Sequence, residues 1–175
     1  MDALKAIASR RSVRRYRAES VPAETVDRIV DCGRLAATAR NLQPVRFVVV
    51  TDPAARAAIA ALAPNGPFIA EAPVCIAVFA ENVPYYLEDG AAATQNMLVA
   101  AAALGLGSCW VAGDKKPYAD AVRTLLGVPE GMRLVSLAAV ARLWRGVRRR
   151  DRLDAEGGKA DVREDQPRIP AVVGS

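Results

Sequence analysis

Residues 87–111 read LEDGAAATQNMLVAAAALGLGSCWV, and this stretch decides the fold. Its first part, Leu87–Leu104, consists mostly of small residues without proline and predicts one long helix. Gly105 and Gly107 predict the end of that helix, and Ser108–Val111 predicts a buried strand directly after it. A long helix that leads into a buried strand indicates a sandwich of helices and strands.

The rest of the chain continues this alternation of helices and strands. Apolar runs predict three further buried strands, over Phe47–Val50, Pro73–Ala80 and Arg133–Val140. Helices are predicted over Ala3–Arg10, Glu24–Thr38, Ala54–Leu62 and Tyr118–Leu126. Because helices and strands alternate and no internal repeat is present, an α/β or α+β sandwich is expected.

The apolar residues of the first two helices predict which faces are buried. In the first helix these residues are Leu4, Ile7 and Ala8. In the second helix they are Val26, Ile29, Val30, Cys32, Gly33, Leu35 and Ala36. Cys32, Cys75 and Cys109 form no CxxC motif and have apolar neighbours, so all three are predicted to be buried, reduced thiols.

Composition excludes several kinds of catalytic site. The chain has 175 residues, the length of one domain, and 52% of them are apolar, which is enough for a core. It contains no histidine, which excludes a histidine general base, a Ser-His-Asp triad, a Cys-His dyad and a zinc site with imidazole ligands. Acid–base chemistry must therefore come from Asp, Glu, Lys, Tyr, water or a cofactor.

Positive charge gathers at the two ends of the sequence. Residues 1–46 hold 10 basic and 5 acidic side chains, residues 47–141 hold 5 and 8, and residues 142–175 hold 9 and 6. An anionic ligand is therefore expected first at the ends. Two readings stay open, a phosphate site and a binder of nucleic acid or another anionic surface. The second is the weaker, because no aromatic residues alternate with the arginines as base stacking requires.

The sequence shows neither an expected membrane span nor an expected export signal. The N-terminus has charges in its first turns and no apolar stretch before Arg10. The longest apolar run, Met97–Gly113, is short for a membrane span. Together with the reduced cysteines, these features predict a cytoplasmic protein.

Three segments, in order, resemble the nitroreductase family of FMN-dependent enzymes. They are RRSVR at Arg10–Arg14, ATARNLQPVRFVVV at Ala37–Val50, and DGAAATQN at Asp89–Asn96 with ALGLGSCW at Ala103–Trp110. No single motif is specific, but the three in this order cover about four-fifths of the chain, residues 1–140. The resemblance implies a nitroreductase-like α+β fold, a three-layer α/β/α sandwich with a mixed, mainly antiparallel sheet.

The resemblance also implies an activity. Members of this family are homodimers with FMN at the subunit interface, so each site uses both chains. NAD(P)H reduces the flavin and leaves, and an electron-poor acceptor such as a nitroaromatic, a quinone or an enone then takes its place in a ping-pong cycle. Because the flavin carries this chemistry, the lack of histidine is no obstacle, and no catalytic side chain is assigned.

The cofactor-binding residues implied by the resemblance have suitable chemistry. Guanidinium groups match phosphate oxygens, and a fixed positive charge at Arg14 near the pyrimidine edge of the ring would stabilise reduced flavin. Asn41 and Gln43 offer donors and acceptors to that edge, and Thr38 offers a hydroxyl. The full set is Arg10, Arg11, Ser12, Arg14, Thr38, Ala39, Asn41, Gln43, Gln95, Gly107, Ser108 and Cys109.

The sequence departs from the family pattern in three places. Residues 141–175 lack the family's usual end, so an FMN-binding domain over residues 1–140 and an atypical, arginine-rich tail, extended or disordered, are expected. The tail is either diverged or read in a shifted frame, and a catalytically impaired homologue with an altered end is the alternative function. Val45 stands where the family has Trp. Arg40 adds a positive charge, and two readings stay open for it: it favours NADPH or an acidic substrate, or it is ordinary surface charge.

Overall fold

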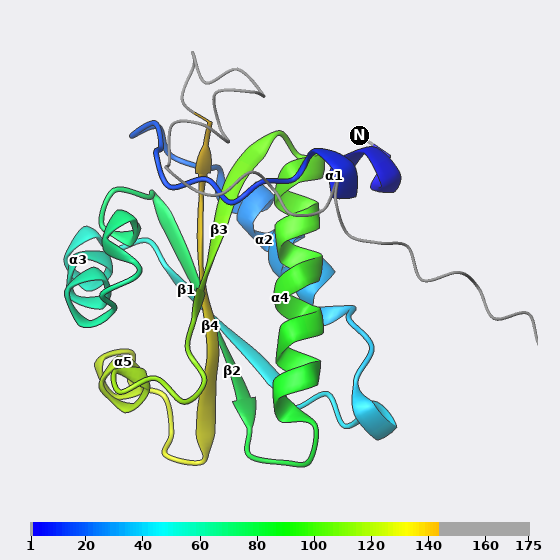
Figure 1. The fold of residues 1–175 in the computed structure, drawn as a ribbon, viewed down its shortest axis with the longest axis vertical. Helices are drawn as coiled ribbons and strands as arrows, with labels where there is room; N and C mark the ends of the chain where they lie inside the picture. Colours follow the sequence, from blue (N-terminus) through cyan, green and yellow to red (C-terminus); the bar gives the residue numbers. More distant parts are fainter. Residues whose placement is uncertain (1, 144–175) are drawn as a thin grey trace, which may run out of the picture. The chain divides into compact units, whose positions relative to one another are not determined.

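The computed structural model describes residues 2–143, and the structural statements that follow concern these residues. Their centre is a four-stranded sheet in the order β1-β2-β4-β3, with each neighbouring pair antiparallel (Figure 1). The strands are β1 (Val45–Val50), β2 (Val74–Glu81), β3 (Leu106–Ala112) and β4 (Met132–Arg142). A parallel contact is made by the isolated bridge between Ser12 and Ser108. All four predicted strands are therefore present; β1, β3 and β4 are longer than predicted, and β2 has the predicted length but is shifted by one residue.

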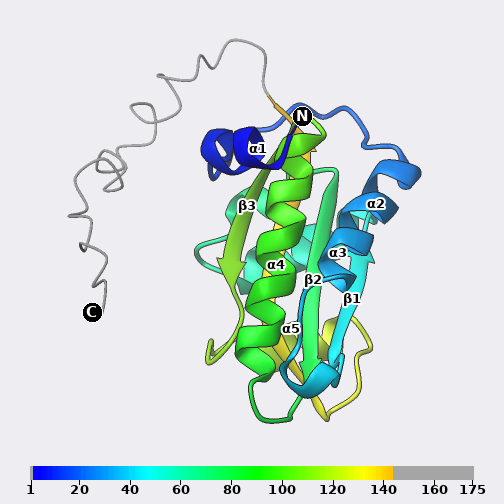
Figure 2. The same cartoon turned by 90° about the vertical axis from the view of Figure 1, so that its right-hand side faces the viewer.

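Helices cover both faces of this sheet and make three layers. Helices α2 (Ala23–Arg34) and α4 (Tyr86–Ala103) pack on one face, and α1 (Ala3–Ser9) lies against α4 (Figures 1 and 2). Helices α3 (Pro53–Leu62) and α5 (Ala119–Leu125) pack on the other face. Short 3-10 turns span Ala39–Asn41 and Pro67–Ile69. The expected three-layer α+β sandwich is confirmed. Between residues 2 and 143, no helix is both long enough and apolar enough to cross a membrane.

The central strand β2 shows why an unbroken apolar run forms here. Ile76 and Val78 pack in the core on the α2 and α4 side, while Cys75, Ala77 and Phe79 pack on the α3 and α5 side. All five side chains are fully buried. A strand covered on both faces reads as a continuous hydrophobic run instead of an alternating one, as the sequence predicts for this segment.

An irregularity in the β2–β4 pairing brings α4 close to the sheet. Val78 pairs with Ser136 but Phe79 pairs with Leu134, so Val135 is an extra residue in β4. The Ser136 hydroxyl lies 2.8 Å from Thr94 Oγ1, and the Thr94 hydroxyl donates to the Gly90 carbonyl at 2.7 Å. The small residues of α4 therefore permit a close helix–sheet contact at this bulge.

The two glycines after α4 have different structural reasons. Gly105 ends the helix with φ +78, a left-handed conformation that glycine adopts without strain. Gly107 lies inside β3, so its predicted part in ending the helix is wrong. A Cβ there would come within 2.6 Å of Leu143 Cδ2 and 3.2 Å of Val13 Cβ. Gly107 instead lets two other segments approach the start of β3.

Two predictions about buried faces are wrong. In α1 the buried residue is Ala6, whereas Leu4 is 79% exposed, Ile7 is 52% exposed and Ala8 is exposed. This short surface helix buries only the side that meets α4, and its larger apolar residues, Leu4 and Ile7, do not lie on that side. Strand β1 is also less buried than predicted, since Val50 is its one buried residue. It is one of the two edge strands of the described sheet; the other, β3, is mostly buried and forms a bridge with Ser12.

The second helix and its cysteine also differ from expectation. Helix α2 ends at Arg34, so Leu35, at 71% exposed, lies beyond the buried stripe. Val26, Ile29 and Gly33 are the buried residues of this helix. Cys32 is exposed, because it lies one position away from the Ile29–Gly33 stripe. Cys75 and Cys109 are buried, as predicted.

Candidate functional site

The arginine segment, residues 10–14, crosses the start of β3. Ser12 forms a bridge with Ser108, and the Val13 N–H donates to the Ser108 carbonyl at 3.0 Å. The missing side chain of Gly107 leaves room for Val13. The fold therefore brings seven of the twelve predicted site residues together at this place: Arg10, Arg11, Ser12, Arg14, Gly107, Ser108 and Cys109.

Side-chain contacts orient the arginine segment. The Arg11 guanidinium donates to the carbonyls of Ala8 at 2.9 Å and Arg10 at 2.8 Å, at the C-terminal end of α1 where a positive charge is favoured. The Arg14 guanidinium carbon lies 5.9 Å from the centroid of the Phe68 ring, a cation–π distance. Ser12 is exposed. The segment thus presents guanidinium and hydroxyl donors from a backbone tied to β3.

Two of the seven residues have buried side chains. Ser108 and Cys109 are each 2% exposed, and Cys109 packs in the core between the sheet and helices α3 and α5. Their side chains are not accessible to a ligand. Their role in ligand binding therefore stays a prediction, and it concerns only their backbone N–H and C=O groups. The thiol of Cys109 contacts the Trp110 carbonyl at 3.8 Å. Its burial agrees with a packing role.

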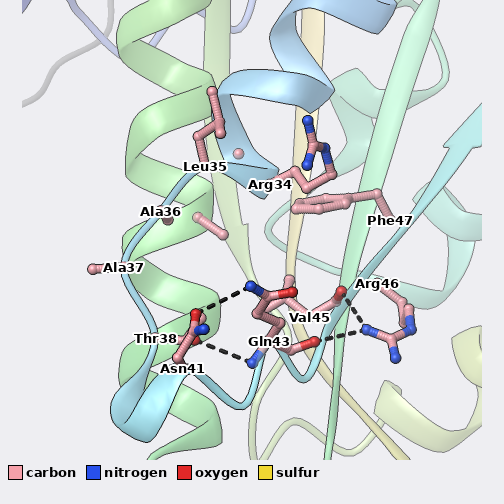
Figure 3. Close-up of a pocket in the computed structure, with 12 residues that line it drawn as sticks. Arg34, Leu35, Ala36, Ala37, Thr38, Asn41, Gln43, Val45, Arg46 and Phe47 are labelled. Carbon is pink, nitrogen blue, oxygen red and sulfur yellow. Dashed lines mark hydrogen bonds between the residues drawn. The ribbon is translucent and has the colours of Figure 1, made fainter.

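The second group of predicted residues lies in the loop of residues 38–43, between α2 and β1 (Figure 3). The Gln43 N–H donates to Thr38 Oγ1 at 3.1 Å, and Gln43 Nε2 donates to Asn41 Oδ1 at 3.0 Å. Arg46 donates to the carbonyls of Gln43 at 2.8 Å and Val45 at 3.0 Å. These bonds tie the two ends of the loop to each other and to the start of β1.

The loop has an unusual backbone. Arg40, Asn41 and Gln43 have φ values of 54, 55 and 52, in the left-handed region that residues other than glycine rarely adopt. Each such residue costs on the order of 1 kcal/mol. The hydrogen bonds within the loop offset this cost and hold one conformation. A ligand would therefore meet donors and acceptors that are already in place.

Asp89 of α4 fixes the start of the same loop, and the sequence interpretation did not assign it a role. Its side chain is 4% exposed, and Oδ1 accepts a hydrogen bond from the Ala39 N–H at 2.9 Å. Its Oδ2 is buried without a hydrogen-bond partner among residues 2–143. No local pattern in the sequence marks this role, because Glu88, Gln95 and Asn96 are further polar residues of the same helix. A buried carboxylate needs a partner.

A cleft of about 530 Å³ opens beside the loop. Thr38, Asn41 and Gln43 supply its hydroxyl and amide groups, and Phe47 supplies an aromatic wall (Figure 3). The remaining lining residues are Gly33, Arg34, Leu35, Ala36, Ala37, Val45, Arg46 and Ala93. Amides beside an aromatic wall fit a flat ring system with a polar edge, and the arginine segment fits a phosphate. The two donor sets together match the chemistry of FMN.

The two groups lie at opposite ends of α4 (Figures 1 and 2). The 38–43 loop meets Asp89 near the first turn of the helix, whereas the arginine segment meets β3 beyond its last turn. Gln95 lies exposed on the helix between them. One described chain therefore does not gather all twelve predicted residues at one place.

The tyrosines at the start of α4 lie apart from the cleft lining. Tyr85 is 56% exposed with a φ of 68, and Tyr86 donates a hydrogen bond to Asp114 Oδ1 at 2.6 Å. That hydrogen bond, with a smaller contribution from burial, raises the pKa of Tyr86 above its ordinary value. Neither tyrosine is among the residues that line the cleft. The Tyr86–Asp114 bond instead connects the helix start to the segment after β3.

Comparisons with known proteins agree with this fold. The sequence profile of the nitroreductase family matches residues 7–74 and 61–142. A protein of Methanothermobacter thermautotrophicus named "Putative NADH dehydrogenase/NAD(P)H nitroreductase" is 35% identical over 136 residues, which cover 74% of this chain and 71% of that protein.

Solved structures give the same result. A protein of the same name from Parabacteroides distasonis superposes with a TM-score of 0.78 at 29% identity, covering 82% of this chain and 88% of that one. A nitroreductase from Bacteroides fragilis, solved with bound FMN, has a TM-score of 0.72 at 25% identity and covers 83% and 90%. The profile match spans nearly all of the described residues and confirms the resemblance seen in the sequence. This chain belongs to the nitroreductase family.

Proposed function

We propose that this chain is an FMN-dependent oxidoreductase that takes electrons from NAD(P)H and passes them to a small electron-poor acceptor. The observation that carries the proposal is the pair of donor sets in a nitroreductase fold, the arginine segment and the 38–43 loop. The relatives support it, since one is named for NAD(P)H and nitroreductase activity and another was solved with FMN.

The arginine segment is the proposed phosphate site. Arg10 and Ser12 lie two positions apart in one extended segment and supply a charge and a hydroxyl to one phosphate. The backbone of residues 12 and 13 pairs with Ser108, and this pairing fixes the position of the backbone from which these donor side chains extend. A cation at Arg14, held against Phe68, would favour a reduced, anionic ring nearby.

The 38–43 loop is the proposed site for the polar edge of the flavin ring. Asn41 and Gln43 already bond to each other, so their amides are oriented before a ligand arrives. When bound, FMN supplies the hydride chemistry that no side chain of this histidine-free sequence supplies. The protein's own contribution is to hold the ring, exclude water from one side of it and leave the other side open.

A homodimer explains why the two donor sets are apart. In a pair related by a two-fold axis, each surface of one chain meets the same surface of the other in reverse. Two copies of α4 that run in opposite directions would bring the arginine segment of one chain to the 38–43 loop of its partner. The exposed Leu4, Ile7 and Leu35 on the same side of the fold would then be covered. Light scattering at several concentrations tests this, and a monomer at all of them would contradict it.

The acceptors proposed are nitroaromatics, quinones and enones, each reduced after NAD(P)H has left the same open face. This order of binding predicts ping-pong kinetics. Double-reciprocal plots at several fixed acceptor concentrations should give parallel lines, and converging lines would exclude the ping-pong order. The cytoplasmic location stays a prediction from the sequence.

The first experiment is a visible spectrum of the purified protein before and after incubation with FMN and desalting. Retained flavin absorbance that bleaches with NADH or NADPH without oxygen supports the proposal. A protein that keeps FMN but is not bleached by either donor supports the alternative, a catalytically impaired homologue. A protein that retains no FMN contradicts the cofactor assignment.

A further inference from the structure

Three arginines surround the 38–43 loop, and two of them are paired with carboxylates. Arg46 Nη2 lies 2.9 Å from Glu81 Oε1, and Arg34 Nε lies 3.2 Å from Asp31 Oδ1. Arg40 is exposed and has neither an ion pair nor a side-chain hydrogen bond with any residue between 2 and 143. Of these three arginines, Arg40 is therefore the one whose positive charge has no carboxylate partner among residues 2–143.

The backbone at Arg40 does not explain why an arginine stands there. With φ 54 and ψ 18, this position suits glycine, and among other residues asparagine or aspartate. Arginine gains nothing from the left-handed conformation and pays its cost. The side chain, not the backbone, must then account for the residue.

The loop around Arg40 keeps its backbone in place. On one side the Ala39 N–H is bonded to Asp89, and on the other side Asn41 is bonded to Gln43. A long charged side chain thus starts from a fixed point between two residues of the proposed flavin site. Arg40 is exposed, and although it is not itself one of the residues that line the cleft, it stands in the loop between Thr38 and Asn41, which are. This arrangement suits a cation that meets a ligand as it enters.

We propose that Arg40 is a specificity-determining residue that binds an oxyanion group, a carboxylate or a phosphate, on the small molecule that exchanges electrons at this site. The inference rests on the proposed function, and it deepens that function by naming the substrate class. The oxyanion has two sources. It is a carboxylate on an aromatic acceptor or the extra phosphate that distinguishes NADPH from NADH.

Matched pairs of ligands distinguish the two sources. The acceptor arm compares kcat/KM for 4-nitrobenzoate and 4-nitrobenzyl alcohol with one donor, and the donor arm compares NADPH and NADH with one neutral acceptor. Arg40→Gln removes the charge and leaves a shorter polar side chain, and Arg40→Lys keeps the charge. Arg40→Asn removes the charge with a residue that suits the left-handed backbone. Arg28→Gln, at an exposed position of α2 away from the cleft lining, is the control.

We expect Arg40→Gln and Arg40→Asn to lower kcat/KM for the anionic member of one pair by about tenfold, mainly through KM. The neutral member should change less than about twofold, and Arg40→Lys and Arg28→Gln should keep the wild-type preference. In the wild-type protein, the preference for the anionic member of that pair should also fade as the salt concentration is raised. Calorimetric titration of the oxidised, FMN-loaded protein with 4-nitrobenzoate and with NADP⁺ gives a readout that does not depend on turnover.

The outcomes separate the two proposals. If FMN is retained and the enzyme turns over, but removing the Arg40 charge changes neither pair, the Arg40 inference is wrong and the proposed function stands. If no variant, wild type included, retains FMN or oxidises NAD(P)H, the proposed function fails and the Arg40 inference fails with it.

Discussion

The carboxylate of Asp89 is bonded to the backbone of Ala39, 50 residues earlier in the chain, with Oδ1 accepting from the N–H at 2.9 Å. This bond connects the first turn of α4 to the strained 38–43 loop. Its acceptor is buried, so water cannot replace it without cost. The geometry of the loop therefore depends on a residue that is not part of it.

The first prediction concerns that bond. Asp89→Ala removes the acceptor and should weaken FMN binding roughly tenfold, because the loop loses an anchor worth about 1–3 kcal/mol. Asp89→Asn keeps an oxygen for the Ala39 N–H and should bind FMN nearly as wild type does. Fluorescence titration with FMN measures both. Glu88→Ala, at the exposed neighbouring position, is the control, and equal losses in Asp89→Asn and Asp89→Ala would count against this account.

The second prediction concerns the phosphate. Arg10→Ala should weaken FMN binding by about tenfold or more, since a hydrogen bond to a charged group contributes about 1.5–3 kcal/mol. Riboflavin, which has no phosphate, should bind wild type and this variant equally. Arg15→Ala, an exposed arginine one position past the arginine segment, should stay within about twofold of wild type for both ligands. Equal effects of the two substitutions would place the phosphate elsewhere.

The third prediction concerns the contact of α4 with the bulge in β4. A Cβ at Gly90 would lie 2.6 Å from Val135 Cγ2 and 2.9 Å from Val135 Cγ1. Gly90→Ala should therefore lower the free energy of unfolding by about 1–3 kcal/mol, despite the better helix propensity of alanine. Urea denaturation measures the loss. Val135→Ala in the same chain should restore part of it, and a double variant with purely additive losses would show that the clash is not the cause.

The fourth prediction concerns alkaline pH. Burial raises the pKa of the Cys75 thiol from 9.0 to about 12, opposed in part by the nearby Arg56. Below pH 9 the thiol is protonated in both the folded and the unfolded protein, and stability is unaffected. Above pH 9 only the unfolded chain ionises readily, so stability falls up to about pH 12, by about 1.4 kcal/mol for each pH unit.

Urea unfolding between pH 8 and pH 10 tests this prediction. Tyr86 and Tyr118 also have a raised pKa, from an ordinary value of 10, so the interval below pH 10 reports mainly the cysteine. Cys75→Ala should flatten the fall in stability over this interval. Cys32→Ala, at an exposed position, should leave it unchanged. An equally steep fall in Cys75→Ala would assign the pH dependence to another group.

The sequence predicts the elements of this fold better than it predicts their surroundings. The long helix and its end at Gly105 follow from local residue preferences, and so do the strands. Whether a strand is central or at an edge is decided by the topology, so the apolar run of β1 is misleading about burial. Leu4 and Ile7 mislead for a similar reason, since a short helix leaves open which side faces the domain.

The candidate site shows the same division. Motif order identifies Thr38, Asn41 and Gln43, and the structure brings them to one cleft. Three of the four residues 40–43 have a left-handed backbone, and the sequence could not predict this because it has no glycine there. The part played by Asp89 depends on a contact across 50 residues, which no local pattern contains. The tail beyond residue 143 lies outside the described residues, so its predicted character remains a prediction.

The separation of the two donor sets along α4 has a consequence for mixtures of defective subunits. In the proposed dimer, a chain with Arg10→Ala damages the site that its own arginine segment serves, and a chain with Asp89→Ala damages the site that its own loop serves. A heterodimer of the two carries both defects in one site and none in the other. Each heterodimer would therefore keep one intact site of its two, so two weak proteins mixed in equal amounts and reassembled at random would recover about a quarter of the wild-type sites, the intersubunit complementation expected of a shared active site.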